Sequence, residues 1–188
     1  TRINSKFEKT RKISGPRSLQ PSQWGMICPS DTPEGESCGL VKNLALISHV
    51  TTEQPDTPII NLAINLGIED INFVSGEEIH STNCYLVYLN GYPLGLTKYP
   101  DKFCSNFRAL RRKGLIHEFV NIHKNDYTKT ILIASDSGRL TRPLIVVKNG
   151  VPQIKQKDLV LLEKNLITFK DLIQNGNIEF LDVNEQND

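Results

Sequence analysis

Near the middle of the 188-residue chain stands the run Tyr85-Leu86-Val87-Tyr88-Leu89-Asn90-Gly91-Tyr92-Pro93-Leu94-Gly95-Leu96. Residues 85–89 are of the types that favour strands, and residues 94–96 resume an apolar pattern. Asn90-Gly91 between them is the favoured two-residue hairpin turn, because both central residues of that turn need a positive φ. The run therefore predicts a β-hairpin.

A helix is predicted on each side of this hairpin. The first has Thr57 as its N-cap and Pro58 at its first helical position, and Gly67 follows its end. The second begins at Pro100 and carries apolar residues at helical spacing up to Leu110. Both patterns predict helices with one apolar face.

The last turn of the second helix is crowded with cations, namely Arg108, Arg111, Arg112 and Lys113. Positive charges there oppose the carbonyl end of the helix dipole. We interpret the cluster as a device that solubilises the helix end, in preference to a nucleic-acid contact, which would need the same residues.

More strands and helices follow along the chain. We predict strands at 119–122, 130–134, 143–148 and 178–183. A turn at 136–139 should let the third of these strands pair back on the second. Helices are predicted at 157–164 and after Thr168, which forms a capping box with Asp171.

The first 40 residues have few periodic apolar positions and many prolines and glycines. Such backbone is extended and punctuated by turns, and it needs another surface to pack against. The predicted fold class is therefore α+β, with an extended, loop-rich N-terminal arm followed by a small mixed α/β domain with antiparallel strands.

Charge is distributed unevenly, although the formal net charge is only +1. Residues 1–17 contain one acid, Glu8, against the six bases Arg2, Lys6, Lys9, Arg11, Lys12 and Arg17. This segment could bind phosphates, or it could be a solvated tail, and charge alone leaves both readings open.

Metal and membrane sites are not expected. The cysteines Cys28, Cys38, Cys84 and Cys104 lack the CxxC spacing of zinc sites, and the four histidines are scattered. No stretch approaches the ~18 consecutive apolar residues of a membrane span. We expect reduced thiols, no bound metal and no membrane segment.

One motif carries a family resemblance: Cys28-Pro29-Ser30-Asp31-Thr32-Pro33-Glu34-Gly35, followed by Gly39-Leu40. It resembles the signature of the second-largest, β-like subunit of multisubunit DNA-directed RNA polymerases. Further segments look like landmarks of the eukaryotic members, in the same order: 89–91, 110–114, 135–144 and 179–185. Residues 14–24, with Ser30-Asp31-Thr32 and the ending Asp182-Val183-Asn184-Glu185, are most similar to RNA polymerase III. Because the chain starts with Thr1 and ends in a polar run, we expect an internal fragment of such a subunit.

The resemblance implies a division of the chain. Residues 1–45 would form the fork and active-centre segment, 46–155 the domain called external 2, and 156–188 the start of the connection to the hybrid-binding core. It also implies a nuclear location and, as partners, the largest subunit, smaller subunits, the DNA template, the RNA–DNA hybrid and nucleoside triphosphates.

Site residues follow from the same resemblance. The family's catalytic Mg²⁺ is held mainly by the largest subunit, so we expect no cofactor on this fragment, no catalytic residue and no activity of the fragment alone. Lys9, Arg11, Lys12 and Arg17 would contact nucleic acid, and Arg17 and Glu34 would support the active centre. Trp24 is interpreted as a packing residue. The alternative is a free-standing nucleic-acid or protein interaction module with a basic N-terminal arm.

Overall fold

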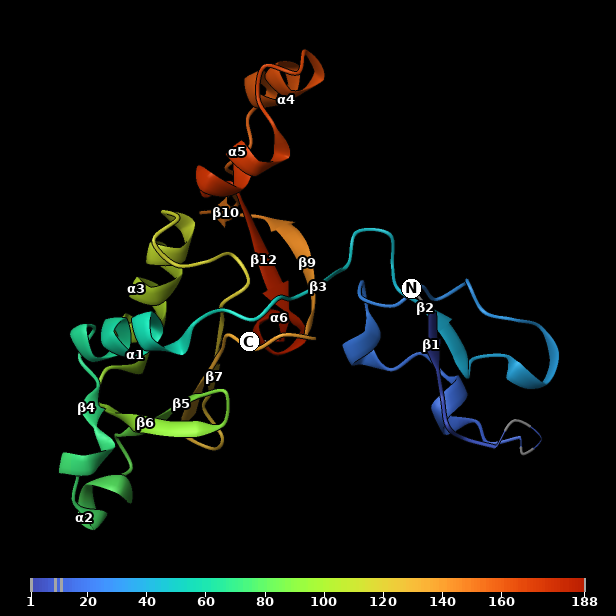
Figure 1. The fold of residues 1–188 in the computed structure, drawn as a ribbon. Helices are drawn as coiled ribbons and strands as arrows, with labels where there is room; N and C mark the ends of the chain where they lie inside the picture. The colour runs from blue at the N-terminus through green and yellow to red at the C-terminus, as the bar shows by residue number, and fades with distance from the viewer. Residues whose placement is uncertain (1, 9, 11, 188) are drawn as a thin grey trace.

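The protein has an extended arm and a packed body (Figure 1). The computed structural model describes residues 2–8, 10 and 12–187. We call residues 2–45 the arm and residues 46–187 the body. Helices and mostly antiparallel sheets alternate along the chain, so the predicted α+β class is confirmed.

The larger sheet of the body has the strand order β4-β6-β5-β8-β7. Its strands are β4 (Glu69–Asp70), β5 (Tyr85–Leu89), β6 (Tyr92–Thr97), β7 (Asn121–Asn125) and β8 (Thr130–Ala134). The predicted hairpin is confirmed: β5 pairs with β6, and Asn90 and Gly91 have φ angles of 50° and 88°. One pair, β5 with β8, is parallel, and the others are antiparallel.

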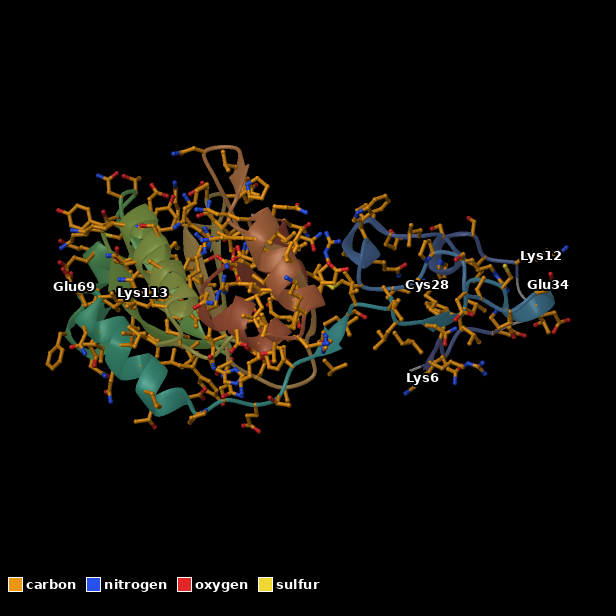
Figure 2. The ribbon with its side chains drawn as sticks, turned by 90° about the horizontal axis from the view of Figure 1, so that it is seen from above. Lys6, Lys12, Cys28, Glu34, Glu69 and Lys113 are labelled. Carbon is orange, nitrogen blue, oxygen red and sulfur yellow. The ribbon has the colours of Figure 1, made fainter. Side chains whose placement is uncertain are left out.

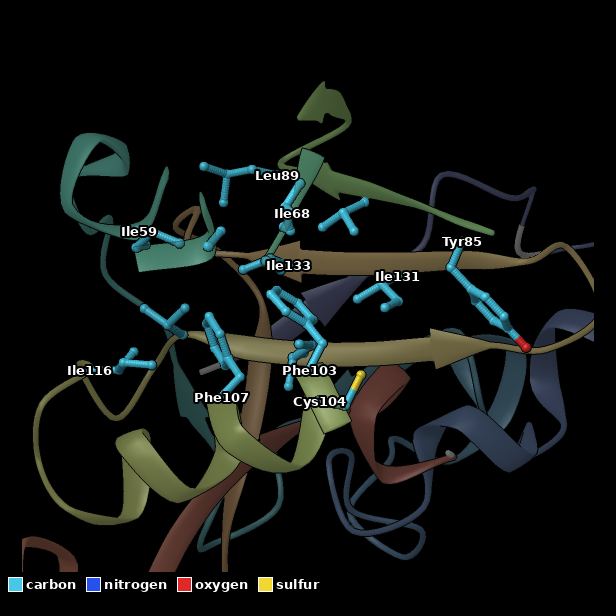
Figure 3. Packing of buried hydrophobic residues seen from close by; sticks show 14 residues of the cluster. Ile59, Ile68, Tyr85, Leu89, Phe103, Cys104, Phe107, Ile116, Ile131 and Ile133 are labelled. Carbon is cyan, nitrogen blue, oxygen red and sulfur yellow. The ribbon is translucent and has the colours of Figure 1, made fainter. Parts of the chain in front are cut away.

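Two helices, α1 (Asp56–Asn65) and α3 (Pro100–Arg112), cover this sheet and form the main core with it (Figure 3). Phe103 and Phe107 point from α3 into the sheet and are buried, as is Ile131 of β8. Both predicted helices are confirmed. The predicted cap is wrong: the N-cap of α1 is Pro55, not Thr57. The helix starts earlier because a proline, here Pro58, is tolerated anywhere in the first turn.

A second sheet joins distant parts of the chain in the order β12-β9-β3. Its strands are β3 (His49–Val50), β9 (Leu140–Ile145) and β12 (Ile178–Asp182), all antiparallel. The prediction that the strand near 143–148 pairs back on its predecessor is wrong. Arg139 turns the chain away, because its guanidinium donates to Asn121 Oδ1 and Asp182 Oδ2 at 2.7 and 3.0 Å.

The remaining elements are short. They are β1 (Arg2–Asn4), η1 (Gly15–Arg17), η2 (Pro21–Gln23), η3 (Gly35–Ser37), β2 (Val41–Asn43), η4 (Ile71–Phe73), α2 (Gly76–Ile79), β10 (Val147–Lys148), β11 (Val151–Pro152), α4 (Gln156–Glu163), α5 (Phe169–Gln174) and α6 (Val183–Gln186). The capping box predicted for α5 is confirmed, since Thr168 Oγ1 accepts the Asp171 N–H. Among the helices described, none is both long and apolar enough to cross a membrane.

The arm has very little core of its own. Within its described residues, only Met26, Leu40 and Val41 are buried. Strand β1 pairs with β2, and an isolated bridge joins Ile27 to Leu44, the residue after β2. Because this core is small, it buries little apolar surface. The arm is therefore held mainly by backbone hydrogen bonds and by the linker to β3.

Candidate nucleic-acid and active-centre site

The signature motif forms a loop in the arm, which we call the strip (residues 28–40). Thr32 closes this loop from inside. Its Oγ1 donates to the carbonyl oxygen of Val41 at 2.9 Å and accepts the N–H of Gly39 at 2.8 Å. One hydroxyl therefore satisfies two backbone groups at the end of the strip and fixes its closure.

Arg17 holds the same strip from the other side. Its Nη1 donates to the carbonyl oxygens of Glu36 and Cys38, at 2.7 and 2.8 Å. Gly39 has a φ of 74°, and a Cβ added there would overlap the carbonyl oxygen of Arg17. Arg17 therefore has a structural role in shaping the strip, whatever else it contacts.

Glu34 is presented by this scaffold. It precedes η3 and is exposed, and it lies with Lys12 at the end of the arm farthest from the body (Figure 2). A pocket of about 620 Å³ opens beside it, lined by Thr10, Lys12, Ile13, Ser14, Arg17, Gly35 and Glu36. The cations Lys12 and Arg17 and the carboxylate Glu36 thus lie around one hollow.

The structure places the predicted nucleic-acid residues as follows. Lys9 and Arg11 lie outside the described residues. Lys12 is exposed, and Arg2 and Lys6 are exposed on the same arm (Figure 2). Exposed cations on an extended arm can approach phosphates without first breaking a buried contact. The roles predicted for these residues stay predictions.

The described part of the chain contains no group of three or more His, Cys, Asp or Glu side chains that could hold a metal ion. Hydrogen bonding to the Ser30 side chain lowers the pKa of the Cys28 thiol, aided by backbone hydrogen bonds of Ser30 and Asp31. The Cys28 Sγ and Ser30 Oγ atoms are 3.5 Å apart. This contact stiffens the first turn of the strip.

The interpretation of Trp24 as a packing residue is wrong for this chain. Its side chain is 66% exposed at the end of η2. Gly25 beside it packs closely, because a Cβ there would overlap the guanidinium of Arg142 from β9. The arm thus meets the body through the glycine, and the indole stays exposed.

The interpretation of the cation cluster on α3 as a solubilising end is also wrong. Arg111 is only 5% exposed, and its Nη1 and Nη2 donate to Glu185 Oε2 and Oε1 at 2.7 and 2.8 Å. Its Nη2 also donates to Glu179 Oε2 at 2.9 Å, and Arg112 donates to Glu179 Oε1 at 2.8 Å. These cations join α3 to β12 and α6, so they stabilise the body.

Sequence reasoning missed two residues that shape the site, Thr32 and Gly39. Both belong to the signature motif. The spacing of that motif does not distinguish residues that shape the loop from residues that contact other molecules. The signal available was Gly39 itself, since a glycine that follows a turn often takes a positive φ or allows a close backbone approach.

Comparisons with known proteins confirm the family resemblance of the signature motif. The family model for RNA polymerase Rpb2, domain 3, matches residues 1–50, and that for domain 4 matches residues 87–148. The chain is 55% identical over all its 188 residues to DNA-directed RNA polymerase III subunit RPC2 of Schizosaccharomyces pombe, and 50% to that of Saccharomyces cerevisiae. It is 37% identical, over 90% of its length, to DNA-directed RNA polymerase subunit Rpo2 of Sulfolobus acidocaldarius.

The chain spans 16% of the length of each of these relatives. Its two matched segments follow in the order of the domain numbers, the arm before the larger sheet. The chain therefore belongs to the RNA polymerase Rpb2 family, that of the second-largest subunits of multisubunit DNA-directed RNA polymerases.

Proposed function

We propose that this chain is the part of an RNA polymerase III second subunit that lines the active-centre cleft and helps to hold downstream DNA and the RNA–DNA hybrid during transcription in the nucleus. One observation carries the proposal. The strip is clamped by Arg17 and Thr32 at the end of an arm whose core is too small to stand alone. Such a loop is built to be supported by a larger assembly while it presents Glu34, and Lys12 is exposed at the same end of the arm.

In this proposal, other chains of the polymerase carry out the nucleotidyl transfer. Nucleotidyl transfer needs metal ions that offset phosphate charge, together with exact positioning of the reacting groups. Mg²⁺ would be held mainly by the largest subunit, and nucleoside triphosphates would bind the complete enzyme. The residues of the strip would position charge beside that site and would perform no proton transfer or covalent step themselves.

The contacts with nucleic acid are electrostatic in this proposal. Lys9, Arg11 and Lys12 would face phosphates of downstream DNA without reading its sequence. Arg17, which lines the pocket beside the strip, would keep the strip in shape and add its charge to the surrounding field.

The test replaces Lys9, Arg11 and Lys12 with Ala in the assembled polymerase and measures DNA affinity against salt concentration. A slope that flattens by about 0.9 for each lost phosphate contact supports the proposal. The control variant replaces Lys98, Lys102 and Lys113, which are exposed on the body outside residues 147–170, and removes the same number of charges. Equal slopes for the two variants would contradict the proposed role of the arm.

A further inference from the structure

Residues 147–170 form a projection that stands away from both sheets of the body, with α4 at its tip (Figure 1). Its base is packed: Val146 and Leu172 on either side of it are each 3% exposed. Its tip is not. Helix α4 contains the run Leu159-Val160-Leu161-Leu162, and none of its residues is buried.

The apolar side chains of the projection continue beyond this helix. The exposed ones are Val147 (55%), Val151 (62%), Leu159 (47%), Val160 (38%), Leu166 (68%) and Phe169 (44%). Hydrophobic residues scattered singly are normal on a protein surface, but this set is gathered in one short segment. A gathering of this kind marks a surface that another molecule covers.

The charges around this apolar set are mostly of one sign. Lys148, Lys155, Lys157, Lys164 and Lys170 are all exposed. Of the two acids in the projection, Asp158 accepts the N–H of Lys155 at 2.9 Å as the capping residue of α4. Glu163 is exposed near the end of the helix. The rim is therefore basic, and it complements a surface that carries carboxylates.

We infer that the projection docks into an apolar groove, rimmed by Asp and Glu, on another polypeptide of the assembled polymerase. Nucleic acid fits the lysines but not the aliphatic side chains, which gain nothing from phosphates. An anionic membrane surface fits both, but α4 has only 8 residues, which is short for a helix that lies in a lipid interface. The helix-in-groove mode of protein recognition uses exposed apolar residues of a helix as anchors, here Leu159 and Val160.

This inference rests on the proposed function only for the identity of the assembly. The experiment therefore purifies the complex that carries the full-length subunit and first assays it for RNA synthesis. If the complex that contains the subunit does not transcribe, the proposed function fails. If the complex transcribes and the projection makes no contact of the stated kind, only the present inference fails.

The test places the photoreactive residue p-benzoylphenylalanine at Leu159 or at Leu166 and identifies the cross-linked peptides by mass spectrometry. The matched control carries the same residue at Tyr127, which is 96% exposed in the β7–β8 turn of the body. We expect Leu159 and Leu166 to cross-link to one apolar peptide, flanked by Asp or Glu, of another subunit. Cross-links within the same polypeptide, to a second copy or to nucleic acid, or none above the Tyr127 level, would overturn the inference.

A second measurement separates docking from folding. The Leu159→Asp/Leu166→Asp variant should retain its melting temperature, because neither side chain is buried, and should weaken retention of the docked subunit by at least about tenfold. Lys155→Glu/Lys157→Glu should weaken it further as salt is lowered, since like charges would then face each other across the rim. Full retention of every subunit by both variants, with the fold intact, would sink the proposal.

Discussion

Gly39 and Gly35 both have positive φ angles, but they differ in the space available for a side chain. Their φ angles are 74° and 81°, so an alanine is strained by about 1 kcal/mol at either position. A Cβ at Gly35 meets open space, whereas one at Gly39 overlaps the backbone of Arg17. We therefore expect Gly39→Ala to cost about 1–3 kcal/mol more than Gly35→Ala. Amide hydrogen exchange over residues 30–41 measures the difference, and equal protection in the two variants would show that Arg17 does not clamp the strip.

Glu34 permits a second test at this scale, because Glu36 lies two residues away on the same strip and is also exposed. If the Glu34 carboxylate only orients charge near the active centre, Glu34→Ala should lower the elongation rate of the assembled polymerase by up to about 100-fold without abolishing synthesis. Glu36→Ala, the control, should change it less. Complete loss of synthesis with assembly intact would instead give Glu34 a direct part in the reaction.

The buried ion pairs between α3 and the C-terminal elements are the strongest link between distant parts of the body. Arg111 and Glu185 are each 5% exposed, so removing Arg111 leaves the buried Glu185 carboxylate with the partly exposed Arg108 as its cationic partner. We expect Arg111→Met to lower the free energy of unfolding by about 3–5 kcal/mol. Lys113→Met, on the exposed residue that caps the same helix, should change it by less than about 0.5 kcal/mol. Chemical denaturation of both variants decides the matter, and similar midpoints would mean that the ion pairs add no stability.

The ion pairs between α3 and Glu179 of β12 should weaken as the pH falls, because the Glu179 carboxylate becomes protonated. Burial alone would raise the pKa of its carboxyl, but the hydrogen bond from Arg112 and the charge of Arg111 outweigh burial and lower the pKa below its ordinary value of 4.5. A lowered pKa means that the stabilisation is fully present above pH 4.5 and is lost as the pH falls through the folded-state value. Glu179→Gln should therefore flatten the decline of unfolding free energy below that pH. Part of the decline should remain, because hydrogen bonds from Thr168 also lower the pKa of Asp171; an unchanged pH profile would contradict the assignment.

Features that depend on residues close together in the sequence could be predicted. Contacts between residues far apart in the sequence could not. The Asn90-Gly91 hairpin and the Thr168 capping box depend on residues within three positions of one another, and both were confirmed. The role of Arg111 depends on Glu179 and Glu185, which lie 68 and 74 positions away. Nothing in the spacing of cations along α3 distinguishes a buried ion pair from a solvated helix end. The strip shows the same limit, since its motif revealed the family but not that Arg17 binds backbone carbonyls.

At the scale of the whole molecule, the C-terminal segment completes the body. The boundary predicted at residue 155 crosses the pairing of β9 with β12 and separates Arg111 and Arg139 from their acids Glu179, Glu185 and Asp182. A protein of residues 46–187 should therefore unfold in one cooperative transition, whereas residues 46–155 alone should lose this transition, because the buried Arg111 would lose the carboxylates of Glu179 and Glu185. Calorimetry on the two proteins measures this directly. If residues 46–155 unfold cooperatively at the same temperature as 46–187, the acids of β12 and α6 are dispensable, and the external domain ends where the sequence alone placed its boundary.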